Sequence, residues 1–200
     1  MVSPAAGYGI GRVYGVAPVI GPLIDANIDG LTTTRYIESR QTVSIDDKSF
    51  FESVKFVDPA FTDIFKLEYL EGSAESALTG TGGLIITEEA AERYFGDKSP
   101  IGETLIIGGE VEASVAAVIK SLPQNSHFVF RFGTANRLQI LAPFKALEVI
   151  SPNNPGNAWI SISDLYRIYI SLNQGVSPEQ ITTQLNSLIE THADERGKEV

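Results

Sequence analysis

The sequence predicts an α+β fold with two lobes, one inserted into the other. Apolar residues alternate over several short runs, as in strands buried on one face, and recur at helical spacing in separate segments. Short helical pieces follow Asp58, and a strand-like pattern returns near His127. A chain of 200 residues can bury one sizeable core or two small lobes. We therefore predict one lobe from residues 1–57 and 125–200, and an inserted lobe from residues 58–124.

The N-terminal part is predicted to be a helix followed by a sheet. Apolar residues recur at helical spacing from Val16 to Ile28, but Pro18 and Pro22 interrupt the pattern. We therefore expect a short helix that starts near Pro22. Alternating residues then predict three strands, the last two joined by a four-residue polar turn at 46–49: Leu31–Ile37, Gln41–Ile45 and Phe50–Val57.

The middle part is predicted to begin with two short helical pieces, near Pro59–Phe65 and Ala74–Leu78, and a strand at Leu84–Ile86. Thr87 is a suitable N-cap for the helix that follows, and Gly96 a suitable C-terminal stop. A hairpin comes next. Its strands, Thr104–Ile107 and Glu110–Ile119, flank the two-residue connection Gly108-Gly109.

The C-terminal part is predicted to alternate strands and helices. The expected elements are a strand at His127–Phe132, a helical stretch at Leu138–Ile150, a loop at Ser151–Asn157 and a strand at Leu165–Leu172. A capping box of Ser177, Pro178 and Gln180 opens the last helix. Its apolar stripe, which predicts packing on the core, consists of Ile181, Leu185, Leu188 and Ile189.

Composition excludes several functional classes. The formal net charge of −10 opposes binding to nucleic acid, and no stripe of Lys and Arg reverses that sign locally. The chain has no cysteine, which excludes thiolate zinc sites, thiol nucleophiles and disulfides. No apolar run reaches the roughly 20 residues of a membrane span. The first residues lack the features of a signal peptide, so we expect either a cytosolic protein or a piece of a longer chain.

Few residues could carry chemistry. His127 and His192 are the only histidines, and thus the only imidazole bases for a Ser or Thr nucleophile. We assign neither to catalysis, because His127 starts a strand and His192 lies on the polar side of the last helix. A glycosidase would need paired carboxylates in a cleft. The acidic pairs fall at turns or helix ends, where solvated acids are usual: Asp46-Asp47, Glu88-Glu89 and Asp194-Glu195.

Two further segments invite a binding interpretation. Gly80-Thr81-Gly82-Gly83 resembles a phosphate loop, but the expected order is helix, loop, strand, and the Gly-Lys-Ser/Thr ending is missing. Trp159 and the strand tyrosines could stack on a sugar, although strand tyrosines more often pack on a sheet. We therefore predict no catalytic, cofactor-binding or metal-binding residues, and no enzyme activity.

An ordered string of short motifs runs from Phe56 to His127. It includes Val57-Asp58-Pro59-Ala60-Phe61, Ile85-Ile86-Thr87-Glu88-Glu89, Tyr94-Phe95-Gly96-Asp97, Pro100-Ile101-Gly102-Glu103-Thr104 and Asn125-Ser126-His127. In this order the motifs resemble the periplasmic core domain of macrolide-exporter and lipoprotein-release permeases, the FtsX-like ABC transporters. Asn157-Ala158-Trp159 and the strand at Leu165 resemble the closing portion of that family more loosely, and the N-terminal residues match least.

The resemblance implies a porter-like α/β lobe made by the two ends of the chain, with a mixed α/β lobe inserted. It places the domain on the periplasmic side of the inner (cytoplasmic) membrane, between the first two membrane helices of a permease. The implied partners are the transmembrane part of the same permease, a separate or fused cytoplasmic ATPase, a second permease copy, and a periplasmic adaptor or lipoprotein. ATP would be used by the ATPase, so this domain is expected to need no cofactor and, as a fragment, to be mainly monomeric.

The leading interpretation is therefore a domain that couples cytoplasmic ATP hydrolysis to substrate movement in the periplasm, without chemistry of its own. An alternative stays open: a free-standing extracytoplasmic module that binds a peptide, glycan or lipid, suggested by Trp159 and the aromatic strand Leu165–Leu172. A hydrolase using His127 ranks third. Macrolides, peptides, lipoproteins and siderophores are all compatible with such a scaffold.

Overall fold

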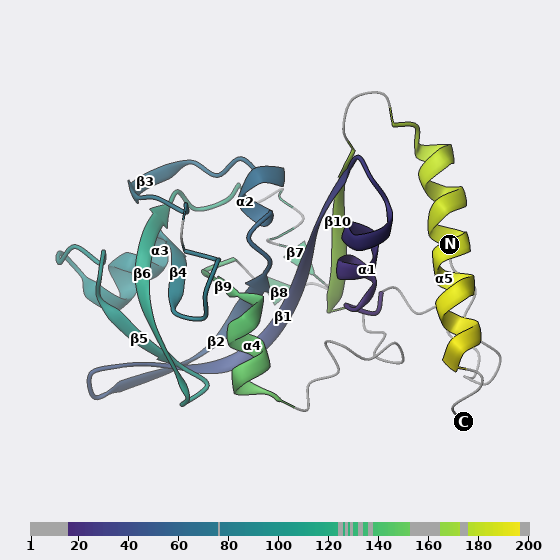
Figure 1. The fold of residues 1–200 in the computed structure, drawn as a ribbon. Helices are drawn as coiled ribbons and strands as arrows, with labels where there is room; N and C mark the ends of the chain where they lie inside the picture. The colour runs from purple at the N-terminus through teal and green to yellow at the C-terminus, as the bar shows by residue number, and fades with distance from the viewer. Residues whose placement is uncertain are drawn as a thin grey trace.

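The structure is a computed structural model, and it describes residues 16–75, 77–123, 126, 128, 130–131, 134–135, 138–152, 165–172 and 176–196. In chain order the elements are α1 (Ile20–Asn27), β1 (Leu31–Ile45), β2 (Lys48–Val57), α2 (Phe61–Ile64), β3 (Tyr69–Gly72), β4 (Gly83–Thr87), α3 (Glu88–Phe95), β5 (Thr104–Ile107), β6 (Val111–Ile119), β7 (Phe130–Arg131), β8 (Thr134–Ala135), β9 (Ile140–Pro143), α4 (Phe144–Ile150), β10 (Tyr166–Leu172) and α5 (Pro178–Arg196). Helices pack around one large mixed sheet, which confirms the predicted α+β class (Figure 1).

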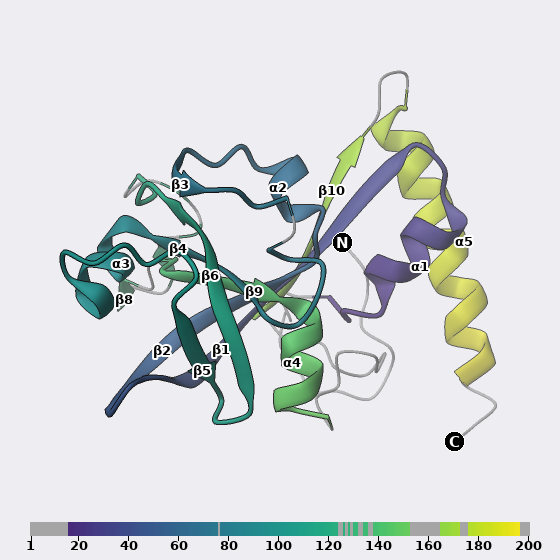
Figure 2. The same ribbon diagram turned by 60° about the vertical axis from the view of Figure 1, so that its left-hand side comes forward.

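The strands β1, β2, β9, β4, β6 and β5 close into a barrel (Figure 2). β2 pairs antiparallel with β1 and parallel with β9, which in turn pairs antiparallel with β4. β6 pairs parallel with β4 and antiparallel with β5. β5 then returns to β1, where Val43 lies opposite Ile107 and Ser44 opposite Ile106. β10 and β3 extend the sheet outside this ring, on β1 and β6 respectively.

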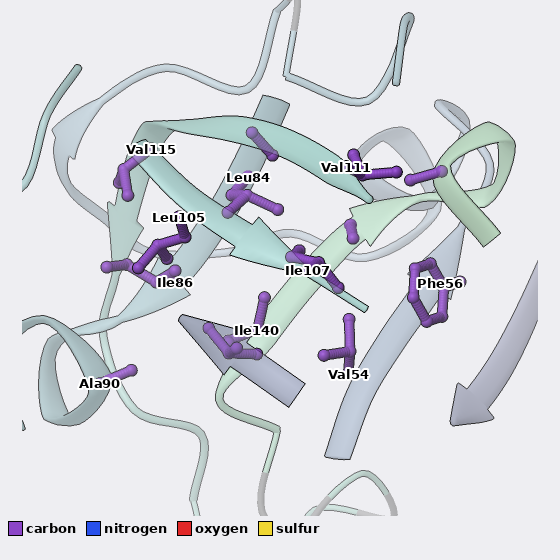
Figure 3. Close-up of a cluster of buried hydrophobic side chains, with 14 of the residues drawn as sticks. Val54, Phe56, Leu84, Ile86, Ala90, Leu105, Ile107, Val111, Val115 and Ile140 are labelled. Carbon is purple, nitrogen blue, oxygen red and sulfur yellow. The ribbon is translucent and has the colours of Figure 1, made fainter. Parts of the chain in front are cut away.

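The interior of the barrel is the main hydrophobic core (Figure 3). Every barrel strand contributes buried aliphatic or aromatic side chains, among them Val43, Val54, Phe56, Leu84, Ile86, Leu105, Ile107, Val111, Val115 and Ile140. Ala90 and Tyr94 of α3 and Phe144 and Leu147 of α4 join this cluster. A second cluster, rich in aromatic rings, includes Tyr36, Phe61 and Phe128.

The predicted strands Leu31–Ile37 and Gln41–Ile45 are one continuous strand, β1. The polar residues between them do not break it, because each keeps its partner on β2, and two of the three pairs, Glu38–Lys55 and Arg40–Ser53, are polar on both strands. The predicted four-residue turn is also wrong. Ile45 pairs with Lys48, so only Asp46 and Asp47 connect the strands, and Asp46 takes the positive φ of 49° that such a tight turn requires.

Several other boundaries differ from the prediction. The helical stretch expected at Leu138–Ile150 divides into strand β9 and helix α4. β9 lies between β2 and β4 and is buried on both faces, so it lacks the alternation that marks a strand. In the expected helix at Ala74–Leu78, the described residues form bends and turns. The β5–β6 connection has three residues, 108–110, since Ile107 pairs with Val111.

Other expectations are confirmed. The first helix, α1, begins at Ile20, so Pro22 falls in its first turn, where a missing N–H costs little. The Thr87 hydroxyl accepts a hydrogen bond from the Ala90 N–H and caps α3, and Gly96 ends this helix with φ 61°. Of the strand expected at His127–Phe132, the structure describes Phe128, which lies in a turn, and β7; residues 153–157 of the expected loop lie outside the described residues.

The division into two lobes stays a prediction. Strands on both sides of the proposed boundaries are hydrogen-bonded into the same barrel, since β1, β2 and β9 belong to the terminal parts and β4, β5 and β6 to the middle part.

Substituting Gly108 by alanine should destabilise the chain more than substituting Gly109. Both residues have positive φ, which costs about 1 to 2 kcal/mol for alanine. A Cβ on Gly108 would also meet Ile150 Cγ2 at 2.6 Å, whereas a Cβ on Gly109 meets nothing within 4 Å. Urea unfolding should therefore give a further loss of about 1 kcal/mol for Gly108→Ala. Equal losses would show that α4 does not press on the barrel there.

Candidate functional site

The first and last described helices lie side by side next to β10 (Figures 1 and 2). α1 leads into β1 at Leu31, α5 follows β10, and Leu31 lies opposite Leu172 at the end of β10. The helices meet in a cluster that we call the terminal-helix cluster: buried Ile24, Ile28 and Ile181, with half-buried Ile20, Leu31, Ile170, Val176, Leu185 and Leu188 around them. The two ends of the described chain are thus joined by apolar contact.

α5 begins with the predicted capping box. The Gln180 N–H donates to Ser177 Oγ and the Ser177 N–H donates to Gln180 Oε1, each at 3.2 Å. Of the predicted apolar stripe, only Ile181 is buried, so α5 packs on α1 along one side and is otherwise exposed. No helix in the described ranges is both long and apolar enough to cross a membrane.

A carboxylate ties α1 to β1. Asp25 Oδ1 accepts from the Thr33 N–H at 3.0 Å, and Asp25 Oδ2 accepts from the Thr33 hydroxyl at 2.7 Å. The same hydroxyl lies 3.3 Å from the carbonyl oxygen of Gly21. Gly21 is also close to Arg35, because a Cβ at this glycine would lie 3.1 Å from Arg35 Cγ. α1 is therefore held on β1 by directional contacts as well as by apolar ones.

The next contact along β1 is an ion pair with two parallel hydrogen bonds. Arg35 Nε donates to Asp58 Oδ2 at 2.8 Å and Arg35 Nη2 donates to Asp58 Oδ1 at 2.7 Å. The Arg35 main-chain N–H also donates to Asp58 Oδ2. The guanidinium lies 3.4 Å from the ring centroid of Phe144, the first residue of α4. This pair therefore joins β1, the end of β2 and α4 at one point.

A buried lysine follows on the same hairpin. Lys55 Nζ donates to Ser53 Oγ at 2.7 Å, and Ser53 Oγ donates to Glu38 Oε1 at 3.0 Å. Burial lowers the pKa of the Lys55 ammonium to about 8, although the charges of Glu38 and Glu52 act in the opposite direction.

On the other side of β2, an ion pair between Glu52 and Arg93 connects this strand to α3. Arg93 Nη2 lies 2.8 Å from Glu52 Oε1 and donates to the Tyr94 hydroxyl at 2.8 Å. Burial is the main reason why the pKa of Tyr94 is raised. The contacts of Arg35 and Arg93 thus link the β1–β2 hairpin to α4 and α3, and those of Lys55 hold its two strands together.

The catalytic candidates that the structure describes do not come together. His192 lies on α5, with Nδ1 2.9 Å from the carbonyl oxygen of Leu188. Asp46 and Asp47 form the exposed hairpin turn. Glu88 accepts from the Ser121 N–H and Glu89 accepts from Gln139 Nε2, in and beside the first turn of α3. His127, Trp159 and the side chains of Asp194 and Glu195 lie outside the described residues.

The glycine-rich segment Gly80–Gly83 is a connection that leads from turns into β4, and the carbonyl oxygen of Gly82 accepts from the Ser114 N–H. Within the described part of the chain, no three His, Asp or Glu residues are arranged to hold a metal ion. The hydrogen bonds and ion pairs around β1 can hold the neighbouring helices and strands together. That the chain has no catalytic, cofactor-binding or metal-binding residues stays a prediction.

Comparison with known proteins identifies relatives. A sequence model of the family described as the MacB-like periplasmic core domain matches residues 5–188. A domain of a protein described as a permease from Porphyromonas gingivalis has a similar structure, with a TM-score of 0.66 and 26% identity; the match covers 89% of this chain and 71% of that one. No curated protein sequence matches the chain.

Two further solved structures share the fold. The periplasmic region of MacB from Actinobacillus actinomycetemcomitans has a TM-score of 0.62 and 14% identity, with 90% of this chain and 75% of that one covered. The extracellular domain of the ABC-type transporter YknZ from Gram-positive bacteria has a TM-score of 0.57 and 18% identity, with 89% and 84% covered.

Replacing Arg35 by methionine should destabilise the chain strongly. The change leaves Asp58 without its guanidinium in a site where the two side chains are only 12% and 21% exposed. We expect a loss of about 3 kcal/mol in the free energy of unfolding, measured with urea. The control is Lys120→Met, which breaks an exposed pair with Glu68 and should cost less than about 1 kcal/mol. Similar losses in both variants would contradict a special role for Arg35.

Stability should increase as the pH rises from 7 to 9.5. The folded chain releases the Lys55 proton near pH 8, whereas the unfolded chain holds it until near pH 10.5. The unfolded state therefore binds more protons in this window, so the free energy of unfolding grows with pH, by about 1 to 2 kcal/mol. This contribution is complete above pH 10.5 and is lost as the pH falls through 8. Lys55→Met should lack it, and parallel pH profiles for the two proteins would refute the assignment.

Proposed function

Since the chain belongs to the family of MacB-like periplasmic core domains of ABC transporter permeases, we propose that it transmits movement from the membrane part of an export or lipoprotein-release permease to the periplasm. Membership of this family implies an extracytoplasmic location. In the proposed cycle, a cytoplasmic ATPase hydrolyses ATP, the transmembrane part moves, and this domain shifts the substrate or its carrier. The domain itself contributes no covalent chemistry.

The observation that supports this proposal best is the continuous set of contacts from the terminal helices to the barrel. α1 and α5 meet in the terminal-helix cluster, Asp25 ties α1 to Thr33, and Arg35 ties β1 to β2 and α4. Because β1 is also a barrel strand, a displacement of the helices moves the barrel with them. A rigid connection of this kind suits a domain whose task is mechanical.

The proposed partners follow from the family. They are the transmembrane part of the same permease, the cytoplasmic ATPase, a second permease copy, and a periplasmic adaptor or lipoprotein. ATP binds to the ATPase in this proposal, so the domain needs no cofactor.

A free-standing ligand-binding module receives less support. Tyr169 of the aromatic strand packs against Tyr36, Phe65 and Phe128, with ring centroids 4.9 to 6.0 Å apart. It therefore belongs to the aromatic core, in keeping with the usual role of tyrosine in a sheet.

Spin labels in the full permease with its ATPase should report the proposed movement. Labels on Asp47, at the barrel turn, and Ser187, on α5, can be placed through cysteines because this chain has none. In spin-diluted samples the Asp47–Ser187 distance within one copy should be the same with and without ATP. The Asp47–Asp47 distance between two copies should change on ATP binding.

The control is an ATPase variant that cannot bind nucleotide, for which neither distance should change. An ATP-dependent change within one copy would show a flexible domain, and an unchanged distance between copies would show that the barrel does not follow the ATPase. Either result would refute the proposal.

A further inference from the structure

β3 forms an open edge of the sheet. It pairs with β6 on one side, and no other described strand pairs with its outer side. The register shifts between Tyr69 and Glu71, so Leu70 is the extra residue of a bulge. All four residues of β3 are exposed. The outer main-chain groups of β3 are thus accessible to an added extended segment.

Three exposed apolar side chains gather at this edge. Tyr69 is 38% exposed, Leu70 48% and Ile101 38%. Ile101 lies against the end of β3, because a Cβ on Gly72 would come within 3.0 Å of Ile101 Cδ1. A hydrogen bond from the Ser99 hydroxyl to Glu71 Oε2 also holds the segment before Ile101 against β3. We call Tyr69, Leu70 and Ile101 the β3 patch; adjoining exposed apolar side chains of this kind mark protein interaction sites.

The surroundings of the β3 patch carry an excess of negative charge. We count the exposed charged residues of the segments 63–73 and 97–104 and the neighbouring Lys120. The acids outnumber the bases: the acids are Asp63, Glu68, Glu71, Asp97 and Glu103, and the bases are Lys66, Lys98 and Lys120. Lys120 is paired with Glu68. Burial and, second, the charge of Asp63 raise the pKa of Tyr69, which places that carboxylate within electrostatic range of the phenol. An apolar centre with an acidic rim favours a partner of opposite charge.

We propose that the β3 patch docks an extended segment of a partner protein in which apolar side chains alternate with lysine or arginine. Its apolar side chains cover Tyr69, Leu70 and Ile101, its main chain lies along the outer edge of β3, and its cations face the acidic rim. A second copy of this chain would place the acidic rims against each other, and an anionic lipid surface would also be repelled. The charge therefore selects a basic protein segment among the possible occupants.

The position of β3 leaves room for such a partner. β3 and α5 lie on opposite sides of the molecule in both ribbon views (Figures 1 and 2). The terminal helices can therefore be engaged by the permease while β3 stays accessible. This inference rests on the proposed function only in placing the partner outside the cytoplasm.

Fluorescence polarisation with two labelled peptides tests the proposal on this chain. One peptide alternates lysine with leucine and phenylalanine; the other has glutamate in place of lysine. We expect only the basic peptide to bind, and Leu70→Ser combined with Ile101→Ser to raise its Kd at least about tenfold. Glu71→Lys should also weaken binding. Phe51→Ser removes another exposed apolar side chain, 69% exposed on β2, and should leave Kd unchanged.

Circular dichroism establishes that the surface variants fold like the wild-type chain. Equal binding by wild type and the Leu70/Ile101 variant would mean general attraction to an acidic protein and would overturn the proposal. Absence of binding, or preference for the acidic peptide, would overturn it too. Dimers that dissociate in the Leu70/Ile101 variant, or binding to phosphatidylglycerol vesicles that this variant loses, would assign the patch to a second copy or a membrane instead. None of these measurements involves nucleotide, so the outcome is separate from that of the spin-label experiment.

Discussion

The register of the β1–β2 hairpin determines most of the contacts that hold this domain together. Its turn contains only Asp46 and Asp47, and from this turn each residue of β1 from Ile45 back to Tyr36 acquires a fixed partner on β2. Arg35 thereby comes level with Asp58, and Glu38 lies opposite Lys55. A shift by one residue would turn the buried side chains of both strands to the wrong face. The barrel depends on the same register, since Val43 of β1 must meet Ile107 of β5.

Local signals in the sequence predicted local structure well. The caps at Thr87 and Ser177 and the glycine stop at Gly96 are correct, because each depends on residues within one helical turn. The class of the fold was also predicted correctly, from the spacing of apolar residues, and so was the family, from a string of motifs that contains turn and cap residues. These residues specify the scaffold, and the family match over residues 5–188 spans all of them.

Non-local structure was not predicted. β9 is hydrophobic throughout, and nothing in its own sequence separates a strand buried on both faces from a helix. The pair Arg35–Asp58 was missed although Asp58 belongs to a motif that carried the resemblance. A four-residue turn at 46–49 places Arg35 opposite Ala60, whereas the actual two-residue turn brings it to Asp58. Correct recognition of one tight turn would have predicted this part of the candidate site.

The pairing of Leu31 with Leu172 has a mechanical consequence. Both terminal helices leave the β1–β10 pair at the same end. A force that pulls the helices apart would therefore break the hydrogen bonds of this pair one after another, starting from that end. A force that moves both helices together along the strand direction would instead load many hydrogen bonds of β1 at once, in shear. The apolar contact between Ile24, Ile28 and Ile181 holds the two helices together at this end of the strand pair. The domain is accordingly built to resist the separation of its helices and to follow their common displacement.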